Sequence, residues 1–584
     1  MQWKAEWTVA CVAGVCATVY ATPLLLGNWD FIVCWDDDVN FAQNDAIRHL
    51  DWHHVRAMLA EVRIGVYEPL AHFLKAIVFA ACGLNSQAVR VVSLMLHVVS
   101  CLILRATSIR LLAFTTKSFD TTSMSVGCTI SAVLYGIHPL NVEVVAWPSA
   151  QPYTLALFFT SSCLYVHVVN RTSGNTGLAR HVMPTVLYGC AVLSKSVAVL
   201  TPVGLVLIDV LVHIVKIDSN KLTFRSLVLQ FLQAFAGFGI VGLMAIWTMV
   251  MSNQGGDSWE ADPLHIPFHE RLVKVFVMLT CALQTWLWPT ELRAHYQLRP
   301  GDMGIPTNAA SLLSVASCVG ITMCTQYVFS MILANEDMIY VGCVCAVSTH
   351  PGMLAAWVYY VVMFLPVCGL VQHGIITLTA DRYAYFPTVV FIPVLGACIA
   401  HGIQSARMSL AWFAIVAMVF AMLSANQVNS WRNDEVLWLH NIQHDPSDWR
   451  ALDHLADYYA KVGRVAESAP YWERSLVHTP RTGLKAKLQE ARLLMFLGRY
   501  ERGCALYDLE LRQFPGSTHL LNNMGVCYMH MRKYDLAKQS FQRAIDYGLG
   551  LSGKHGADTE TPQVNLKQLE GWDGQANYHA HLMW

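Results

Sequence analysis

The sequence predicts an all-helical protein in two parts: a polytopic membrane domain, residues 1–426, followed by a helical repeat domain, residues 427–548. The chain of 584 residues is 55% hydrophobic and only 14% charged, with a mean hydropathy of +0.40, which is too apolar for an ordinary soluble protein. Apolar runs of about 18 residues recur along the first two thirds. The charged share then rises from about 10% before Gln427 to about 23% after it, which places a domain boundary there.

Charge and cysteine content exclude several classes of protein. The formal net charge of −1 excludes a basic nucleic-acid-binding protein, so no nucleic-acid partner is expected. Most of the 17 cysteines lie inside apolar runs, where cysteine behaves as a small hydrophobic residue, and no Cys-x-x-Cys pair of the zinc type occurs. We therefore expect neither a disulfide framework nor a metal cluster.

The apolar runs predict about eleven membrane crossings. The first run is predicted to be a retained signal anchor, because no A-x-A-like cleavage site follows it and further runs do. The run at 182–215 is long enough for two short crossings. The runs are 7–26, 89–104, 124–145, 153–169, 182–215, 227–251, 272–288, 312–333, 353–371, 388–400 and 410–426.

Short basic loops set the predicted orientation. Arg105 and Arg110 follow one span and Arg171 and Arg180 follow another, so these loops are expected on the cytoplasmic side by the positive-inside bias. The loop at 28–66 then faces the opposite side. An odd number of crossings puts the C-terminal domain on that side too.

The C-terminal domain carries a repeat of about 34 residues. This spacing, with small and apolar residues between the markers, matches the helix-turn-helix pattern of tetratricopeptide repeats. About three repeats fit, which is the usual minimum for such a stack. The remaining residues, 549–584, are polar and are expected to be disordered. The markers are Pro446, Pro480, Pro515, Gly463, Gly498 and Gly525.

The first external loop carries the strongest chemical signal, W-D-D-D-V-N at 35–40. The adjacent carboxylates Asp36, Asp37 and Asp38 repel one another, and near an interface of low dielectric they raise one another's pKa values. Such a carboxylate suits a general base. The alternative is a solvated loop with a metal-binding or helix-capping role.

Two cations interrupt otherwise apolar stretches, Lys195 in L-S-K-S and Arg382 in A-D-R-Y-A-Y-F-P. Cations there are costly unless they pair or line a site, and an anionic lipid head group would satisfy both. Arg382 can hold phosphate oxygens in a bidentate fork, while Lys195 acts as a point charge. The alternative is that Lys195 snorkels to the interface and Arg382 pairs with Asp381.

The order of motifs along the chain resembles a known family. Together with the repeat tail, it is similar to the transmembrane and tetratricopeptide repeat O-mannosyltransferases and their bacterial repeat-containing membrane relatives, from about Asp36 to about Ala544. The motifs are W-D-D-D-V-N at 35–40, Y-E-P-L at 67–70, L-M-L-H ending at 97, I-H-P-L-N-V-E-V-V-A-W at 137–147, L-S-K at 193–195, L-W-P at 287–289, L-P-V-C-G-L at 365–370, A-D-R-Y-A-Y-F-P at 380–387 and S-W-R-N-D-E at 430–435.

This resemblance implies a multi-pass glycosyltransferase of the GT-C superfamily in the endoplasmic reticulum membrane, with the repeat domain in the lumen. Such an enzyme moves mannose from a polyprenyl (dolichyl) phosphate to a protein Ser or Thr hydroxyl, with inversion and without a metal or cofactor. An acidic residue of the first external loop serves as base, which is Asp36 here, with Asp37 beside it. The donor phosphate falls to Arg382, with Lys195, and the repeats would hold the acceptor polypeptide or a partner protein.

Further residues of these motifs are candidates for orienting the substrate. His138 taken alone is more typical of a packed, hydrogen-bonded histidine than of a ligand. The candidates are His72, His138, Glu143 and Tyr383.

The chain departs from the family pattern at some positions. Gln151 and Tyr153 lie in a stretch where the family tends to place an arginine and an acidic residue, and Thr285 stands where a lysine often precedes L-W-P. These departures leave open a second hypothesis, a catalytically degenerate membrane-anchored repeat scaffold that binds a partner. A transporter or channel fits less well, because most intramembrane charge lies near span ends.

Overall fold

The computed structural model describes most of the chain, and its helices fall into two compact units. Apart from Ile266, which groups with unit 2, unit 1 comprises the described residues up to His440, and unit 2 comprises those from Asn441 onward. Within the described residues the regular structure is helical, apart from one isolated bridge between Arg63 and Val66, so the all-helical prediction is confirmed. The described residues are 2–60, 62–116, 119–173, 179–216, 239, 242–243, 246, 266–299, 302–303, 309–334, 351–370, 377–405, 409–479, 484–550 and 560–570.

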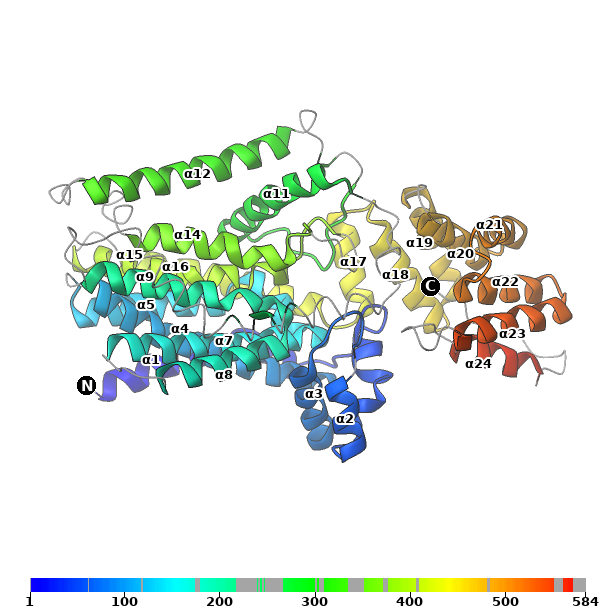
Figure 1. The fold of residues 1–584 in the computed structure, drawn as a ribbon, viewed down its shortest axis with the longest axis horizontal. Coiled ribbons are helices and arrows are strands. Elements are labelled where there is room, and N and C mark those ends of the chain that lie inside the picture. Colours follow the sequence, from blue (N-terminus) through cyan, green and yellow to red (C-terminus); the bar gives the residue numbers. More distant parts are fainter. Residues whose placement is uncertain are drawn as a thin grey trace. The chain divides into compact units, whose positions relative to one another are not determined.

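Unit 1 is built mainly from long apolar helices that lie side by side, among them α4, α5, α7 and α15 (Figure 1). The short helices α2 and α3 come from the loop between α1 and α4. The helices are α1 Gln2–Leu25, α2 Trp52–Ala60, α3 Pro69–Cys82, α4 Ser86–Thr115, α5 Thr121–Gly136, α6 Val142–Ala146, α7 Gln151–Thr172, α8 Ala179–Ser194, α9 Thr201–Lys216, α11 Phe268–Leu287, α12 Ala309–Ala334, α14 Pro351–Phe364, α15 Phe391–Gln404 and α16 Leu410–Ser430, followed by α17 Asp434–His444.

Five of the described helical segments are long and apolar enough to cross a membrane, and a bent helix pair makes up to six. This supports a membrane protein, while the count of about eleven crossings stays a prediction. Shorter apolar helices of 10–17 residues cover parts of other predicted runs. The run at 227–251 falls almost entirely outside the described residues. The five segments are Ser86–Thr115, Pro148–Thr172, Ser196–His213, Pro387–Gln404 and Leu410–Ser430.

The run predicted as one continuous span at 124–145 is instead two helical pieces bent by 52°. Helix α5 ends at Gly136, and Pro139 begins the next turn. Proline lacks a backbone N–H and drives the preceding residue out of the helical region, so His138 is extended (φ −67°, ψ 129°). The bend places Glu143, in α6, among buried residues of unit 1.

The run at 182–215 contains two helices, as its length predicts. Lys195 lies at the break between α8 and α9, with an extended backbone (φ −156°, ψ 128°). The side chain of Lys195 therefore projects from a non-helical residue between the two helices.

Helices α5 and α15 approach closely because Gly127 has no side chain. A Cβ built at Gly127 would lie 2.4 Å from the carbonyl oxygen of Gly396 and 2.9 Å from the backbone nitrogen of Ala400. We expect Gly127→Ala to destabilise the protein by about 1–3 kcal/mol, since the overpacked helices must separate. The measurement is the midpoint of thermal unfolding in detergent. Gly320→Ala in α12, with open space around the new methyl group, is the control; equal midpoints for the two variants would refute the close crossing.

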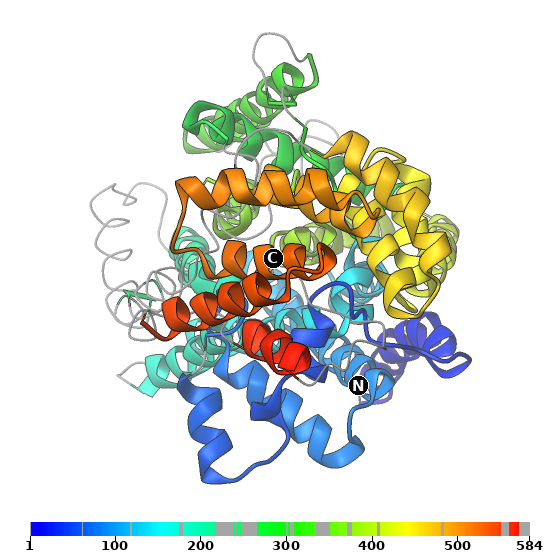
Figure 2. The same cartoon turned by 90° about the vertical axis from the view of Figure 1, so that its right-hand side faces the viewer.

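The described part of unit 2 contains the end of α17, three antiparallel helix pairs and one further helix, coloured yellow to red in Figure 2. In each pair the turn contains a residue with positive φ: Gly463 (83°), Gly498 (70°) and Arg532 (58°). These positions are 35 and 34 residues apart. The helices are α18 Trp449–Lys461, α19 Val465–His478, α20 Leu484–Phe496, α21 Tyr500–Gln513, α22 Thr518–His530, α23 Tyr534–Gly550 and α24 Glu560–Glu570.

The structure corrects one of the sequence markers of the repeat. Gly525 is not a turn residue but lies inside α22, where a Cβ would meet the ring of Phe541 at 2.5 Å. Its role is close packing between α22 and α23. Arg532 takes the third turn, so the period is more regular than the glycine spacing indicates.

Two further expectations for the C-terminal region are wrong. Cys504 of α21 and Cys527 of α22 form a disulfide, although the sequence predicts none. Within the segment 549–584, expected to be disordered, residues Glu560–Glu570 form α24, which packs against α23. The Asn565 amide donates a hydrogen bond to the Asn522 side-chain oxygen at 2.9 Å. Residues 551–559 and 571–584 lie outside the described residues.

Candidate active site

The three adjacent aspartates of the loop between α1 and α4, Asp36, Asp37 and Asp38, have different environments. Asp37 is fully buried and is held by backbone and side-chain donors. Its carboxylate accepts hydrogen bonds from the Ile32 N–H at 2.7 Å and from the Ser149 N–H and hydroxyl at 2.9 and 2.5 Å. Burial raises the pKa of Asp37 to about 7, although these donors oppose the shift. Asp37 therefore ties the loop to the start of α7.

Asp38 begins the short helical turn Asp38–Ala42. Its carboxylate accepts a hydrogen bond from the Val39 N–H at 2.7 Å. Asp38 is thus the first residue of the turn and not its cap; the cap residue is Asp37, whose side chain makes no capping hydrogen bond, so the helix-capping alternative is not observed here.

Asp36 is the aspartate whose carboxylate remains available. It is half-buried, and among the described residues none donates a hydrogen bond to its side chain. Burial raises the pKa of Asp36, while the charges of Arg382 and Lys195 lower it by a smaller amount. The acid of the first external loop and the two cations predicted from distant segments are thus brought together.

Arg382 is held by Glu143. The Arg382 backbone N–H donates to one carboxylate oxygen of Glu143 at 2.7 Å, and its Nη1 donates to the other. Glu143 is 1% exposed, so this is a buried ion pair. Asp381, the alternative partner from the sequence, instead accepts a hydrogen bond from the Tyr296 hydroxyl at 2.6 Å.

The guanidinium of Arg382 is positioned by aromatic rings and keeps donors free. It lies 5.3 Å from the ring centre of Trp147 and 5.0 Å from that of Tyr383. Such contacts fix the plane of the guanidinium. Its Nε and Nη2 make no hydrogen bond to the described residues, so both can donate to a ligand.

Lys195 is paired rather than snorkelling. Its Nζ donates a hydrogen bond to Glu68 and lies 5.1 Å from the ring centre of Tyr153. Glu68 immediately precedes Pro69, the first residue of α3. The motif Y-E-P-L contains Glu68, but sequence reasoning assigns it no role; a carboxylate next to an apolar helix is the signal that points to it.

Helix α3 contributes two more polar side chains. His72 and Lys75 follow Glu68 at helical spacing, so the three share one face of the helix. His72 is 3% exposed, and its Nδ1 finds no hydrogen-bond partner in the described part of the chain. The Lys75 Nζ donates to the Asn40 side-chain oxygen at 2.8 Å. Sequence reasoning misses Lys75, although a lysine inside an apolar helix is itself a signal of pairing.

His138 is a packed structural histidine. Its Nε2 is 2.9 Å from the Trp286 carbonyl oxygen, and its Nδ1 accepts a hydrogen bond from the Leu140 N–H at 3.2 Å. The ring stacks on Trp286 at 5.7 Å and borders a mostly apolar cavity of about 220 Å³. Because backbone groups occupy both nitrogens, His138 has no free atom with which to orient a substrate.

Acidic and basic side chains from several segments form one cluster, which we call the ion cluster. It joins the loop between α1 and α4, α3, α6, the break before α9 and the turn before α15. Its charged members are Asp36, Glu68, Glu143, Lys75, Lys195 and Arg382.

No protein-family model matches the chain, and a search of curated proteins finds no relative.

Proposed function

We propose that the protein is a membrane glycosyltransferase of the GT-C class. It transfers a monosaccharide, mannose by the family resemblance, from a polyprenyl (dolichyl) phosphate to a protein Ser or Thr hydroxyl on the luminal side of the endoplasmic reticulum membrane. One observation carries the proposal: Asp36, which accepts no side-chain hydrogen bond from the described residues, lies near enough to the cations Arg382 and Lys195 for their charges to lower its pKa. A free base beside fixed cations is what this transfer requires.

The reaction is a single displacement. The acceptor hydroxyl oxygen attacks the anomeric carbon while Asp36 takes the hydroxyl proton. The bond between the anomeric carbon and the phosphate oxygen breaks, and the lipid phosphate leaves with that electron pair. The configuration inverts because attack and departure occur on opposite faces of the sugar. The free Nε and Nη2 of Arg382 and the ammonium of Lys195 stabilise the negative charge on the phosphate.

Neighbouring residues position these groups. Glu143 and Trp147 fix the guanidinium of Arg382, and Tyr383 covers its other side. The unpaired Nδ1 of His72 is an acceptor for a sugar hydroxyl. Membrane lipid surrounds the donor chain in this arrangement.

The pH dependence of transfer tests the base. Asp36 must be ionised to accept a proton, and burial raises its pKa above 3.8, so we expect the rate to fall on acidification with a midpoint above that value. The charge of Asp38 contributes to the rise, so Asp38→Asn should move the midpoint to lower pH. The measurement is kcat/KM for mannose transfer from dolichyl phosphate mannose to a Ser/Thr peptide between about pH 4 and 8. If the midpoint on the acidic side of the pH profile is the same in Asp38→Asn as in the wild type, Asp36 is not the base.

Unit 2 fits a tetratricopeptide repeat domain that holds the acceptor polypeptide or a partner protein. The support is the recurrence of helix pairs with left-handed turns every 34–35 residues, at Gly463, Gly498 and Arg532. The disulfide between Cys504 and Cys527 supports a luminal location, since disulfides persist in oxidising compartments.

A second candidate is a degenerate scaffold. It is favoured by the pairing of both proposed phosphate-binding cations, since Arg382 already holds Glu143 and Lys195 holds Glu68. Assay of the purified full chain with dolichyl phosphate mannose separates the two. A scaffold gives no transfer above that of an Asp36→Asn variant, whereas the enzyme does.

A further inference from the structure

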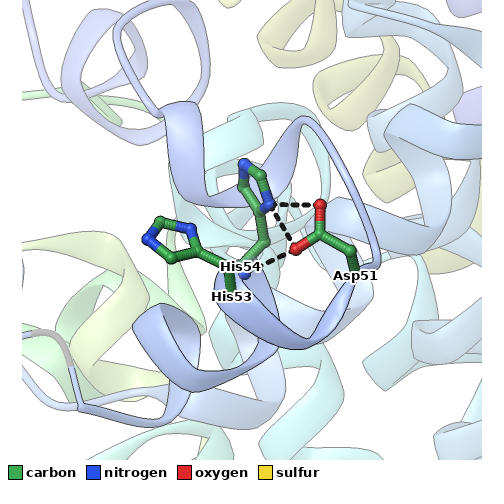
Figure 3. Close-up of side chains that lie close together, drawn as sticks. All are labelled: Asp51, His53 and His54. Carbon is green, nitrogen blue, oxygen red and sulfur yellow. Dashed lines mark hydrogen bonds and ion pairs between the residues drawn. The ribbon is translucent and has the colours of Figure 1, made fainter.

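A second group of chemically active side chains, which shares no residue with the ion cluster, lies in the loop between α1 and α4. The sequence H-L-D-W-H-H at 49–54 leads into α2. Figure 3 shows Asp51 and His54 in direct contact, with His53 beside them. The Nδ1 of His54 is 2.8 Å from each carboxylate oxygen of Asp51, and one donor atom from each of the three residues falls within 4.8 Å of the others.

His49 is a fourth potential ligand, and the group is accessible to solvent. The ring centre of His49 lies 5.0 Å from that of His54, and the ring of His53 lies 5.3 Å away. The side chain of Asp51 is 57% exposed and that of His54 is 22% exposed, so an ion reaches them from solvent.

The donor set indicates which ion fits. Imidazole nitrogens with one carboxylate suit zinc and its late transition-metal neighbours, whereas magnesium and calcium prefer oxygen ligands alone. Zinc–ligand distances of about 2.0–2.2 Å place tetrahedral ligand atoms roughly 3.3 Å apart. The donors of Asp51, His53 and His54 lie within 4.8 Å of one another, which is close to that spacing.

We propose that Asp51, His53 and His54, with His49, bind one zinc-type ion that clamps the first external loop. The structural consequence runs through Arg48, next to His49. Its Nη2 donates hydrogen bonds to the carbonyl oxygens of Phe41 and Ala42, at 3.0 and 2.6 Å. Arg48 supports the end of the turn Asp38–Ala42. An ion bound at the neighbouring His49 therefore also holds this turn in place. This ion stabilises the loop and takes no part in the sugar-transfer step.

Helix capping accounts for only part of this geometry. Asp51 accepts a hydrogen bond from the His54 N–H at 3.0 Å, as a residue that caps α2 does. The His53 backbone N–H also contributes to this cap, but capping does not account for the positions of the imidazole rings of His53 and His49. Asparagine caps as well as aspartate, so Asp51→Asn keeps the cap while removing the charged ligand.

The test is zinc binding by the purified full-length protein, prepared in detergent without a histidine tag. After dialysis against a zinc buffer, bound zinc is measured by elemental analysis. We expect the variant His53→Gln/His54→Gln to lose one tightly bound ion, and Asp51→Asn to bind it at least about 10-fold more weakly. His269→Ala, which removes an exposed histidine of α11, is the matched control and should keep the ion.

A second readout follows the loop itself. Zinc should slow trypsin cleavage after Arg56, an exposed residue of α2, in the wild type and in His269→Ala but not in the double variant. The proposal is overturned if the double variant binds as much zinc as the wild type with the same affinity. It is also overturned if Asp51→Asn binds zinc unchanged, or if the wild type binds none in excess of the double variant.

Discussion

Replacing Asp36 with asparagine is expected to lower sugar transfer by about 10²–10⁴-fold, the usual contribution of a general base, without unfolding the protein. Asparagine has nearly the same size but cannot take the acceptor proton. The substitution breaks no hydrogen bond among the described residues, because none is donated to the Asp36 carboxylate. The rate loss should therefore appear in kcat as well as in kcat/KM, with the thermal midpoint near that of the wild type.

The adjacent aspartates provide matched controls. Asp38→Asn removes the same charge from a neighbouring position of the same loop and should retain most of the transfer rate. Asp37→Asn loses an acceptor for either the Ile32 or the Ser149 donors, so it should lower stability by about 1–3 kcal/mol. The measurement is the initial rate with dolichyl phosphate mannose and a Ser/Thr peptide, beside an unfolding curve. If Asp36→Asn transfers sugar as fast as Asp38→Asn, the glycosyltransferase proposal is wrong.

Composition and charge alone predict the helical architecture and several members of the ion cluster. Charged residues are costly in an apolar stretch of chain, so Lys195 and Arg382 stand out from the sequence alone. The helix-breaking effect of Pro139 also follows from the sequence, but its consequence does not. The bend it causes carries Glu143 to Arg382, a partner 239 residues away along the chain.

The remaining features of the site depend on where side chains point and on contacts between segments that are far apart in the sequence. Asp36, Asp37 and Asp38 are chemically identical in the sequence, and only the fold decides that Ser149 binds Asp37 while Asp36 stays open. Sequence spacing does not contain that information, because it comes from a segment more than 100 residues away. Similarly, a turn residue with positive φ can be an arginine, so a glycine pattern finds Gly463 and Gly498 and misses Arg532.

Breaking the buried pair between Glu143 and Arg382 is expected to destabilise the protein strongly. Glu143→Gln leaves a guanidinium in a buried site without its counter-charge, and Arg382→Met leaves the carboxylate in the same state. Each should cost about 3–5 kcal/mol. The double variant removes both charges and should recover a substantial part of that loss. The measurement is a double-mutant cycle from unfolding in denaturant, in detergent.

The exposed pair Arg464 and Glu467 supplies the matched control, because its side chains are 40% and 54% exposed and also form a direct ion pair. Glu467→Gln should change the free energy of unfolding far less than Glu143→Gln does, because solvent screens an exposed ion pair. If Glu143→Gln costs no more than that, the pair is not buried in the working protein and does not hold Arg382 in place.

The same cycle separates an enzyme from a scaffold. In a scaffold, Arg382 serves only the fold, so a double variant that recovers stability also recovers partner binding, and there is no transfer to lose. In the enzyme, the Nε and Nη2 donors of Arg382 stabilise the departing phosphate, and methionine supplies none of them. Recovered stability with transfer still reduced by about 10²–10³-fold therefore assigns Arg382 to the phosphate. If the double variant recovers both stability and sugar transfer, the lipid phosphate is held elsewhere, and Arg382 matters only because Glu143 needs a counter-ion.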